Sequence, residues 1–165
     1  MSPFQSSDAA STLSSRASRT LIHVAWENSE QAEYFHGFVS GYAKAVFRSG
    51  TAERVILASH ELLENALRYS LMSREITYAL VVTALEVQVS VQNSTISSRI
   101  EMLRAQLTRI RENPASTYTT ELERSMSGAG RRAMLGLVRI CHEADMELRA
   151  AIETSNVTVT ASSRR

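Results

Sequence analysis

The chain has 165 residues and a formal net charge of +1, with 44% hydrophobic and 21% charged residues. This length can bury a core without disulfides or metals, and the nearly balanced charge excludes an electrostatic footprint for nucleic acid or anionic lipid. The single cysteine, Cys141, cannot form an intramolecular disulfide, which is typical of a reducing compartment. No apolar run is long enough to cross a bilayer, and no signal-peptide pattern is present. We therefore expect a cytoplasmic protein with one domain over residues 19–163 and no nucleic-acid or membrane partner.

The first part of the chain predicts a tail, a strand and two helices. Residues 1–18 are rich in Ser and Ala and carry few apolar side chains, so we predict a disordered tail, because little buried surface can offset the ordering entropy. Alternating apolar residues predict a strand at 20–26. A helix follows from a cap at Ser29 to about residue 48 and ends at Gly50, and a second helix begins at Thr51.

The second part of the chain predicts a sheet with one solvent-exposed face, because apolar and polar residues alternate cleanly in its strands. The expected elements are strands at 75–83 and 85–92, a helix at 96–111, a polar loop at 115–131 around a short helical stretch at 119–126, a helix at 132–144, and strands at 146–154 and 156–161. The order β-α-α-β-β-α-α-β-β requires helices on one face of a mixed or antiparallel sheet. The predicted fold class is α+β, a two-layer α/β sandwich.

The second predicted helix carries two polar residues with chemical potential. Glu61 and Asn65 are four residues apart, so a helix places their side chains side by side. They lie at the edge of the apolar stripe of this helix, which is formed by Val55, Ser59, Leu62, Ala66 and Tyr69. A carboxylate that can accept a proton, beside an amide oxygen that can hold Mg²⁺, suits phosphoryl transfer. The same pair could also be an ordinary solvated helix face.

Two other features bear on the choice between these interpretations. Gly128-Ala129-Gly130 precedes a later helix, and small residues there leave the first backbone N–H groups free to face an anion. His60-Glu61-Leu62 is also similar to the phosphoacceptor context of sensor kinases, which would make His60 a phosphotransfer residue. The apolar stripe, however, places His60 near the buried side, and phosphotransfer helices form four-helix bundles rather than strand-rich folds.

The segment 61–69 resembles the N-box of the GHKL (Bergerat-fold) ATPases, whose pattern is Glu, three residues, Asn-Ala. Over residues 20–161 the chain resembles the stand-alone anti-sigma-factor-type Ser/Thr kinases, and among them the SiaB-like branch, through its segments 92–96, 127–130 and 135–137. The resemblance implies a Bergerat-type sandwich with ATP and Mg²⁺ as cofactors. It further implies that Glu61 is the catalytic base.

The same resemblance implies the rest of the site, residue by residue. Asn65 would be the Mg²⁺ ligand and a cofactor-binding residue, and Asn93 would lie on the adenine side. Gly128, Gly130 and Gly136 would shape the phosphate-binding lid and the start of the following helix. The chain departs from the family at the adenine box, where it lacks the Asp-x-Gly-x-Gly pattern.

These features lead to one functional expectation and one alternative. We expect a regulatory Ser/Thr protein kinase that phosphorylates a small antagonist-like protein in a partner-switching pathway. The alternative is a binding module of the same fold that sequesters its partner without nucleotide chemistry, which the missing adenine Asp favours. By analogy with such kinases the chain could form a homodimer, with the Ala43, Val46 and Phe47 side of its first helix as the surface.

Overall fold

The computed structural model describes residues 19–26, 30–71, 76–127 and 132–164. The elements in these ranges are β1 (Arg19–Trp26), α1 (Glu30–Val46), α2 (Ser49–Tyr69), β2 (Ile76–Val82), β3 (Glu86–Ser94), α3 (Ser97–Glu112), α4 (Pro114–Met126), α5 (Arg132–His142), β4 (Glu147–Glu153) and β5 (Asn156–Arg164). The predicted tail at 1–18, the predicted cap Ser29 and the glycines Gly128 and Gly130 lie outside the described residues.

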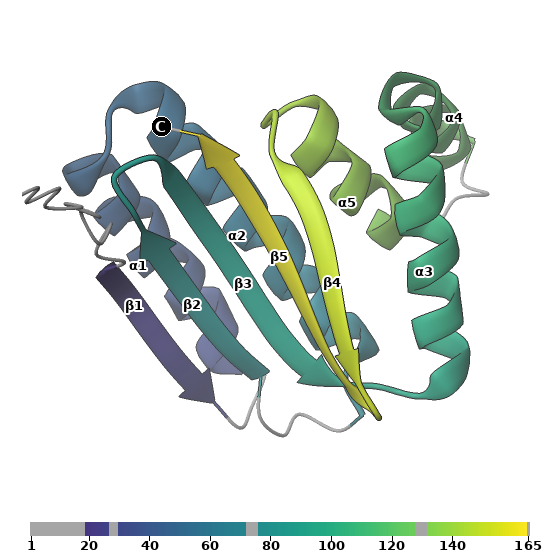
Figure 1. The fold of residues 1–165 in the computed structure, drawn as a ribbon, viewed down its shortest axis with the longest axis horizontal. Coiled ribbons are helices and arrows are strands. Elements are labelled where there is room, and N and C mark those ends of the chain that lie inside the picture. Colours follow the sequence, from purple (N-terminus) through teal and green to yellow (C-terminus); the bar gives the residue numbers. More distant parts are fainter. Residues whose placement is uncertain (1–18, 27–29, 72–75, 128–131, 165) are drawn as a thin grey trace, which may run out of the picture.

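The strands form a single five-stranded sheet in the order β1-β2-β3-β5-β4, and every neighbouring pair is antiparallel. In Figure 1, α1, α2 and α5 lie behind the sheet, on one of its faces, and α3 and α4 lie beyond its β4 edge. Burial alternates residue by residue along β2 and β3, because one face packs against helices and the other is open. The predicted α+β class with an antiparallel sheet is therefore confirmed.

The core lies between this sheet and α2. Val55 and Leu63 on α2 are fully buried, as are Leu80 on β2 and Val89 on β3. A polar contact inside this layer joins the α2 hydroxyl of Ser59 to the β2 hydroxyl of Tyr78, with the two oxygens 2.8 Å apart. Burying the apolar face of α2 along its whole length orients its remaining side chains at the margins, where Glu61 and Asn65 lie.

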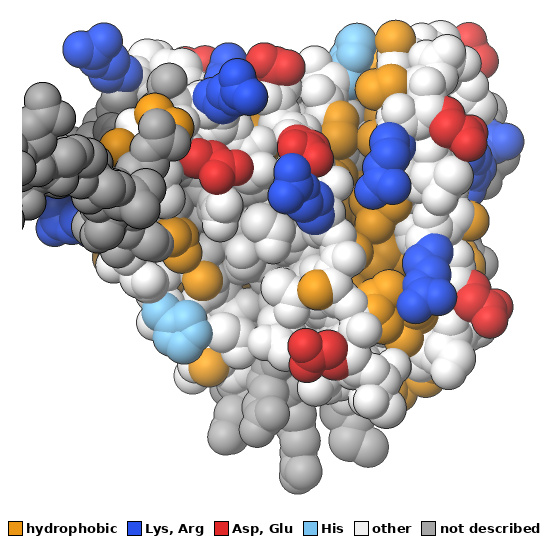
Figure 2. Space-filling model, viewed as in Figure 1, with side chains coloured by type: hydrophobic (Ala, Val, Ile, Leu, Met, Phe, Trp, Pro, Cys, Tyr) orange, Lys and Arg blue, Asp and Glu red, His pale blue; other side chains and the backbone are white. Residues whose placement is uncertain are grey.

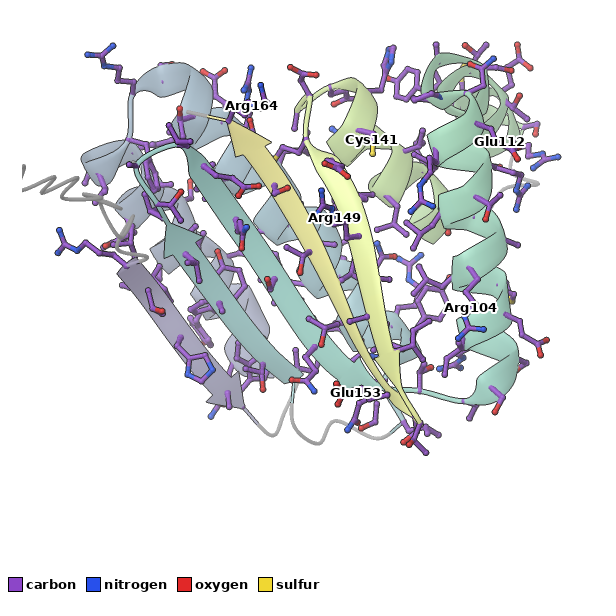
Figure 3. All side chains as sticks on the ribbon, in the orientation of Figure 1. Arg104, Glu112, Cys141, Arg149, Glu153 and Arg164 are labelled. Atoms are coloured by element: carbon purple, nitrogen blue, oxygen red, sulfur yellow. The ribbon has the colours of Figure 1, made fainter. Side chains whose placement is uncertain are left out.

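The open face of the sheet is mostly polar. Figure 2 shows it from the solvent side, and few hydrophobic side chains lie over its central strands. Ser90 on β3 and Thr160 on β5 hydrogen-bond across this face at 3.0 Å. Hydrophobic side chains gather instead in a furrow between β4 and α3, beside which Figure 3 labels Arg104 and Arg149.

The structure corrects the predicted loop at 115–131, because α4 is a full helix that begins at Pro114. The Asn113 side chain accepts a hydrogen bond from the backbone N–H of Ser116 at 3.0 Å, as a helix cap does. Proline is favoured in the first turn of a helix, where its missing N–H needs no partner. Asn113-Pro114 therefore ends α3, as predicted, and also begins α4.

Several boundaries also differ from prediction. α1 ends at Val46, so Gly50 lies in the first turn of α2 and does not end the preceding helix, and β3 continues to Ser94. The helix expected to begin at Thr51 begins at Ser49. β5 continues to Arg164 instead of ending near residue 161, because its whole length pairs with β3. The turn before it is formed by Thr154 and Ser155, with Thr154 in the left-handed region at φ 57°.

Candidate functional site

Glu61 lies on the side of α2 that faces α5, with 7% of its surface exposed. Its Oε1 accepts a hydrogen bond from Nη1 of Arg139 on α5 at 2.5 Å. Burial raises the pKa of the Glu61 carboxyl above its ordinary value, because the charged form loses its hydration, while the charges of Arg139 and then His60 act in the opposite direction. The net result is a carboxylate that binds a proton more readily than an exposed one.

Gly136 on α5 lies directly against this carboxylate. A Cβ atom at position 136 would clash with Oε2 of Glu61, and it would lie 3.2 Å from the Glu61 Cδ and 3.6 Å from Nδ2 of Asn65. The missing side chain therefore provides the space in which the two α2 side chains lie. The structure brings together three of the predicted site residues, Glu61, Asn65 and Gly136.

The Asn65 side chain has an unsatisfied amide. Its Nδ2 is buried and has no hydrogen-bond partner among the described residues. The two ends of a side-chain amide are assigned from their partners, so the orphaned position can hold either the nitrogen or the oxygen. A buried unpaired polar group costs about 1–3 kcal/mol. Such a group on the wall of a cavity indicates a place for a ligand.

That cavity lies below Asn65, with a volume of ≈ 80 Å³. Its walls are mainly apolar and come from α2, β3, α3, α5 and β5; they include Leu62, Ala66, Val91, Leu103, Leu137 and Val159. Asn93, which is 8% exposed, is among its few polar residues. The Asn93 Nδ2 donates to the backbone oxygen of Ser94 at 3.3 Å, which leaves Oδ1 as an acceptor.

A network of charged groups holds Arg139 in place. Its Nε and Nη2 donate to the two carboxylate oxygens of Glu143, each at 3.0 Å. The Tyr118 hydroxyl on α4 donates to the same Glu143 carboxylate at 3.0 Å. These hydrogen bonds, that from Arg139 first, hold the pKa of Glu143 below its ordinary value. Arg139 is thus positioned from α4 and α5 toward Glu61.

Sequence reasoning missed Arg139. The only local signal is its spacing of four residues from Glu143, which is common on helices. The contact with Glu61 joins residues 78 positions apart, so no local pattern reveals it.

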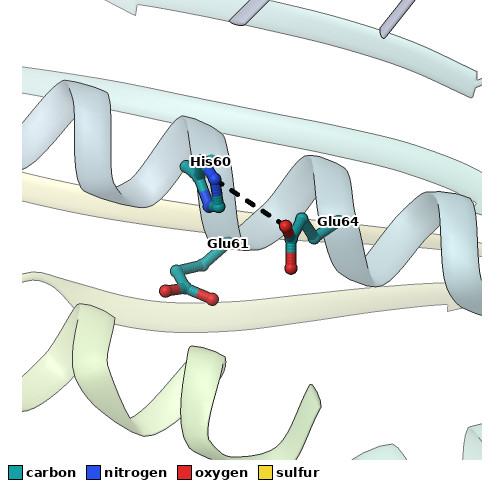
Figure 4. Close-up of side chains that lie close together, drawn as sticks. All are labelled: His60, Glu61 and Glu64. Carbon is teal, nitrogen blue, oxygen red and sulfur yellow. Dashed lines mark ion pairs between the residues drawn. The ribbon is translucent and has the colours of Figure 1, made fainter. Parts of the chain in front are cut away.

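His60, Glu61 and Glu64 form a cluster of metal-ligand types on α2 (Figure 4), with candidate ligand atoms within 4.8 Å of one another. The His60 Nε2 lies 3.7 Å from Oε1 of Glu64, and both side chains are about half exposed. The expectation that His60 lies near the buried side is wrong: its ring packs on the His36 ring of α1 at 4.7 Å between centroids and faces solvent. Because Arg139 already binds the Glu61 carboxylate, this cluster is better described as an ion pair on the surface of α2.

Comparison with known proteins supports the fold. No protein-family model and no curated protein sequence matches the chain. Among solved structures, a chain in the SiaB–SiaC complex from Pseudomonas aeruginosa is similar, with a TM-score of 0.66 and 19% sequence identity over 88% of this chain and 90% of that chain. This similarity supports a SiaB-like fold. No helix in the described ranges has both the length and the apolar character that crossing a membrane requires.

Proposed function

We propose that this chain is a Bergerat-type regulatory Ser/Thr protein kinase, which uses Mg²⁺-ATP to phosphorylate a small antagonist-like protein in a partner-switching pathway. The observation that carries the proposal is the grouping of Glu61 and Asn65 against the side-chain-free Gly136. The similar solved structure is a complex of two proteins, SiaB and SiaC, which supports a protein partner for this chain as well.

The chemistry assigned to Glu61 is that of a general base. Its carboxylate would accept the proton of an incoming Ser or Thr hydroxyl, and its raised pKa, caused by burial, increases its basicity. Arg139 would orient the carboxylate through the hydrogen bond to Oε1. Arg139 is therefore a positioning residue.

The residues around the cavity fit a magnesium nucleotide in part. Asn65 would bind Mg²⁺ through its amide oxygen, which would leave no orphaned buried amide. Bound ATP supplies the phosphoryl group. The Asn93 Oδ1 can accept a hydrogen bond from a purine amino group, as the family's Asp does, although without a charge. The apolar walls suit a purine ring.

The size of the cavity favours the alternative of a binding module without nucleotide chemistry. Pockets for drug-sized ligands measure about 300–1,000 Å³, whereas this one measures ≈ 80 Å³. A nucleotide therefore requires α3, which forms one wall, to move away from the sheet. Arg139 also neutralises the Glu61 carboxylate that would act as the base.

One experiment separates the two proposals. The chain is incubated with Mg²⁺ and γ-labelled ATP, together with a candidate antagonist-like protein, and phospho-Ser or phospho-Thr is measured on that protein. The melting temperature of the chain itself is measured in parallel, with and without millimolar ADP or ATP, because a ligand that binds the folded state raises the melting temperature. Label on the partner supports the kinase. No label and no nucleotide-dependent shift would leave the binding module.

We also propose a homodimer, on a different face of α1 from the one expected. Of the three residues expected to form the surface, Ala43 and Phe47 belong to the core and cannot do so, whereas Val46 is 47% exposed. The outward face of α1 instead carries Tyr34, which is 84% exposed, and Phe38, which is 54% exposed. Sedimentation velocity of Phe38→Ser should show loss of the dimer; a wild-type chain that is monomeric at all concentrations contradicts it.

A further inference from the structure

We propose that the furrow between β4 and α3 binds an acidic, extended segment of a partner protein, which adds as a strand to the free edge of β4. The inference rests on the partner of the proposed function but not on its chemistry, because the furrow lies on the far side of the sheet's last strand from Glu61. Three features carry it: the free backbone groups of β4, the apolar side chains in the furrow, and the excess of arginines beside it.

The free backbone groups follow from the hairpin between β4 and β5. Glu153 pairs with Asn156 across a two-residue turn, so this pair exchanges both of its backbone hydrogen bonds, and so does every second pair before it. The alternate residues Leu148, Ala150 and Ile152 direct their N–H and C=O groups away from β5. The Leu148 N–H bonds to the Cys141 thiol, which agrees with this register.

Ala150 and Ile152 therefore offer an open edge. Within the described part of the chain, neither forms a backbone hydrogen bond outside the pairing with β5. An exposed strand edge with free donors and acceptors is the template on which an extended peptide adds as a further strand. Natural edges are usually blocked by proline, by a bulge or by a covering helix. Between Leu148 and Glu153 this edge has no proline, and α3 lies beside it across the furrow (Figure 1).

The lining of the furrow combines apolar side chains with charged ones. An open hollow of ≈ 990 Å³ takes in its upper part, where Leu107 and Ile110 of α3 face Leu148 of β4. Figure 2 shows hydrophobic side chains along the furrow between the strand and the helix. An added strand would bury its alternate side chains there, since successive side chains of a strand point to opposite faces.

The positive charge beside the furrow favours an acidic segment as the bound peptide. The hollow is lined by four arginines and three acidic residues, Arg111 among the arginines, so cations are in excess. Arg104 lies on α3 beside the furrow (Figure 3). Arg104 has no acidic partner among the described residues, and Arg111 acts only on the Glu147 carboxylate that Arg149 already binds at 3.0 Å. Both guanidinium groups can therefore attract an acidic segment and give its carboxylates bidentate partners.

A second copy of the chain fits this edge less well. Isologous pairing of two β4 strands would bring the same surface from both copies together. Arg104 and Arg111 of each copy would then face those of the other, and like charges across a strand pair are destabilising. The acidic segment of another protein is therefore the better occupant.

The test uses nuclear magnetic resonance of the ¹⁵N-labelled full chain with two short synthetic peptides, one alternating glutamate with valine and one alternating lysine with valine. We expect the acidic peptide to shift the amide signals of Ala150 and Ile152 and to slow their exchange with solvent. The double variant Arg104→Glu/Arg111→Glu should weaken its binding at least about fivefold. Lys44→Glu/Arg48→Glu makes the same charge change on exposed residues near the end of α1 and should leave binding unchanged.

Ala150→Pro provides a second test, because proline removes one free N–H of the edge without removing a bond to β5. Its peptide binding should be lost while its far-ultraviolet circular dichroism is retained. If that variant does not fold, the arginine variants alone decide. Equal binding of the lysine peptide, or signals shifted at β1 instead of β4, would overturn the proposal. So would self-association that the arginine reversals abolish, because it assigns the edge to a second copy.

The outcome is independent of the kinase proposal. Glu61→Ala should bind the acidic peptide as the wild-type chain does. Peptide binding without any phosphoryl transfer would refute the kinase and keep the docking edge. Transfer to the partner that is unaffected by both edge variants, with no peptide binding, would refute the docking edge and keep the kinase.

Discussion

The two ends of the candidate site are built differently. At the Glu61 end, the side chain is held by Arg139, which binds Glu143, and Glu143 in turn accepts from Tyr118. The charged groups there are paired, while the neighbouring Asn65 amide is not. At the Asn93 end, most of the wall surface is apolar, and the polar residues include Asn93, a neutral amide with a spare acceptor, and Arg99. The charged groups at the Glu61 end, which we propose for phosphoryl transfer, are thus ordered without a ligand, while the end that we propose for a purine is small and mainly apolar. This contrast predicts that chemistry and nucleotide affinity respond to different substitutions.

The largest expected effect is on phosphoryl transfer in Glu61→Gln. A general base contributes about 10²–10⁴-fold to a rate, and a neutral amide cannot accept the proton. Transfer to the partner should fall by that factor, while the nucleotide-dependent rise in melting temperature remains. Asn65→Ala is the matched comparison, because it should lose the nucleotide effect as well. Unchanged transfer in Glu61→Gln would refute the assigned base.

A smaller loss of transfer is expected for Gly136→Ala, because the new methyl group displaces the Glu61 carboxylate. A displaced catalytic group costs up to about 100-fold in rate. Stability should change little, since alanine gains about 1 kcal/mol of helix propensity over glycine and the clash falls on a side-chain end that can move. Gly41→Ala on α1, where a Cβ meets open space, should only raise the unfolding free energy. Equal behaviour of the two variants in the transfer assay would contradict the close contact.

Arg139→Met tests the charge network through both stability and pH. The substitution leaves the buried Glu61 carboxylate without its partner, which lowers the unfolding free energy. Because the Arg139 side chain is 36% exposed, the loss should be smaller than for a fully buried pair, about 2 kcal/mol. The Arg139 charge lowers the pKa of Glu61, so its removal raises that pKa further. The base is active when deprotonated, so the acidic limb of the transfer rate should move to higher pH.

The stability of this variant should depend on pH in the matching direction. A carboxyl group whose pKa is raised in the folded state binds protons more tightly there than in the unfolded state. The unfolding free energy therefore falls as the pH rises from the pKa of Glu61 in the unfolded chain through its higher pKa in the folded protein. Denaturant titrations at several pH values should show that the unfolding free energy of Arg139→Met continues to fall up to a higher pH than that of the wild-type chain. Arg139→Met/Glu61→Gln, which has no carboxylate at position 61, should abolish this difference.

The smallest expected effect concerns the purine end. Asn93→Asp introduces the family's acceptor, and a charged hydrogen bond to an amino group should add about 1 kcal/mol to nucleotide binding. Without nucleotide, the buried carboxylate should lower the unfolding free energy by about 2 kcal/mol. Calorimetry with ADP measures the first effect, and thermal unfolding the second. Asn156→Asp, at an exposed position, controls for the added charge. Tighter binding in the control but not at position 93 would contradict the proposed role of Asn93.

Much of the fold was predictable because its signals are local. The alternation in β2 and β3 and the apolar stripe of α2 reflect the periods of a strand and a helix, which neighbouring residues determine. The prediction failed at α4, where the polar composition outweighed the Asn113-Pro114 start signal. It failed again at Ala43 and Phe47, because a helix with apolar residues on several sides does not reveal which side faces the core.

By itself, the sequence determined the spacing of Glu61 and Asn65 on one helix face, the alternation that makes one side of the sheet polar, and the likeness of segment 61–69 to an N-box. Tertiary structure alone decided what those residues contact. Arg139 reaches Glu61 across 78 positions of sequence, Gly136 opens the space beside both α2 side chains, and β4 ends the sheet beside α3. Contacts between distant segments depend on how whole elements pack, and no residue pattern within one element encodes them.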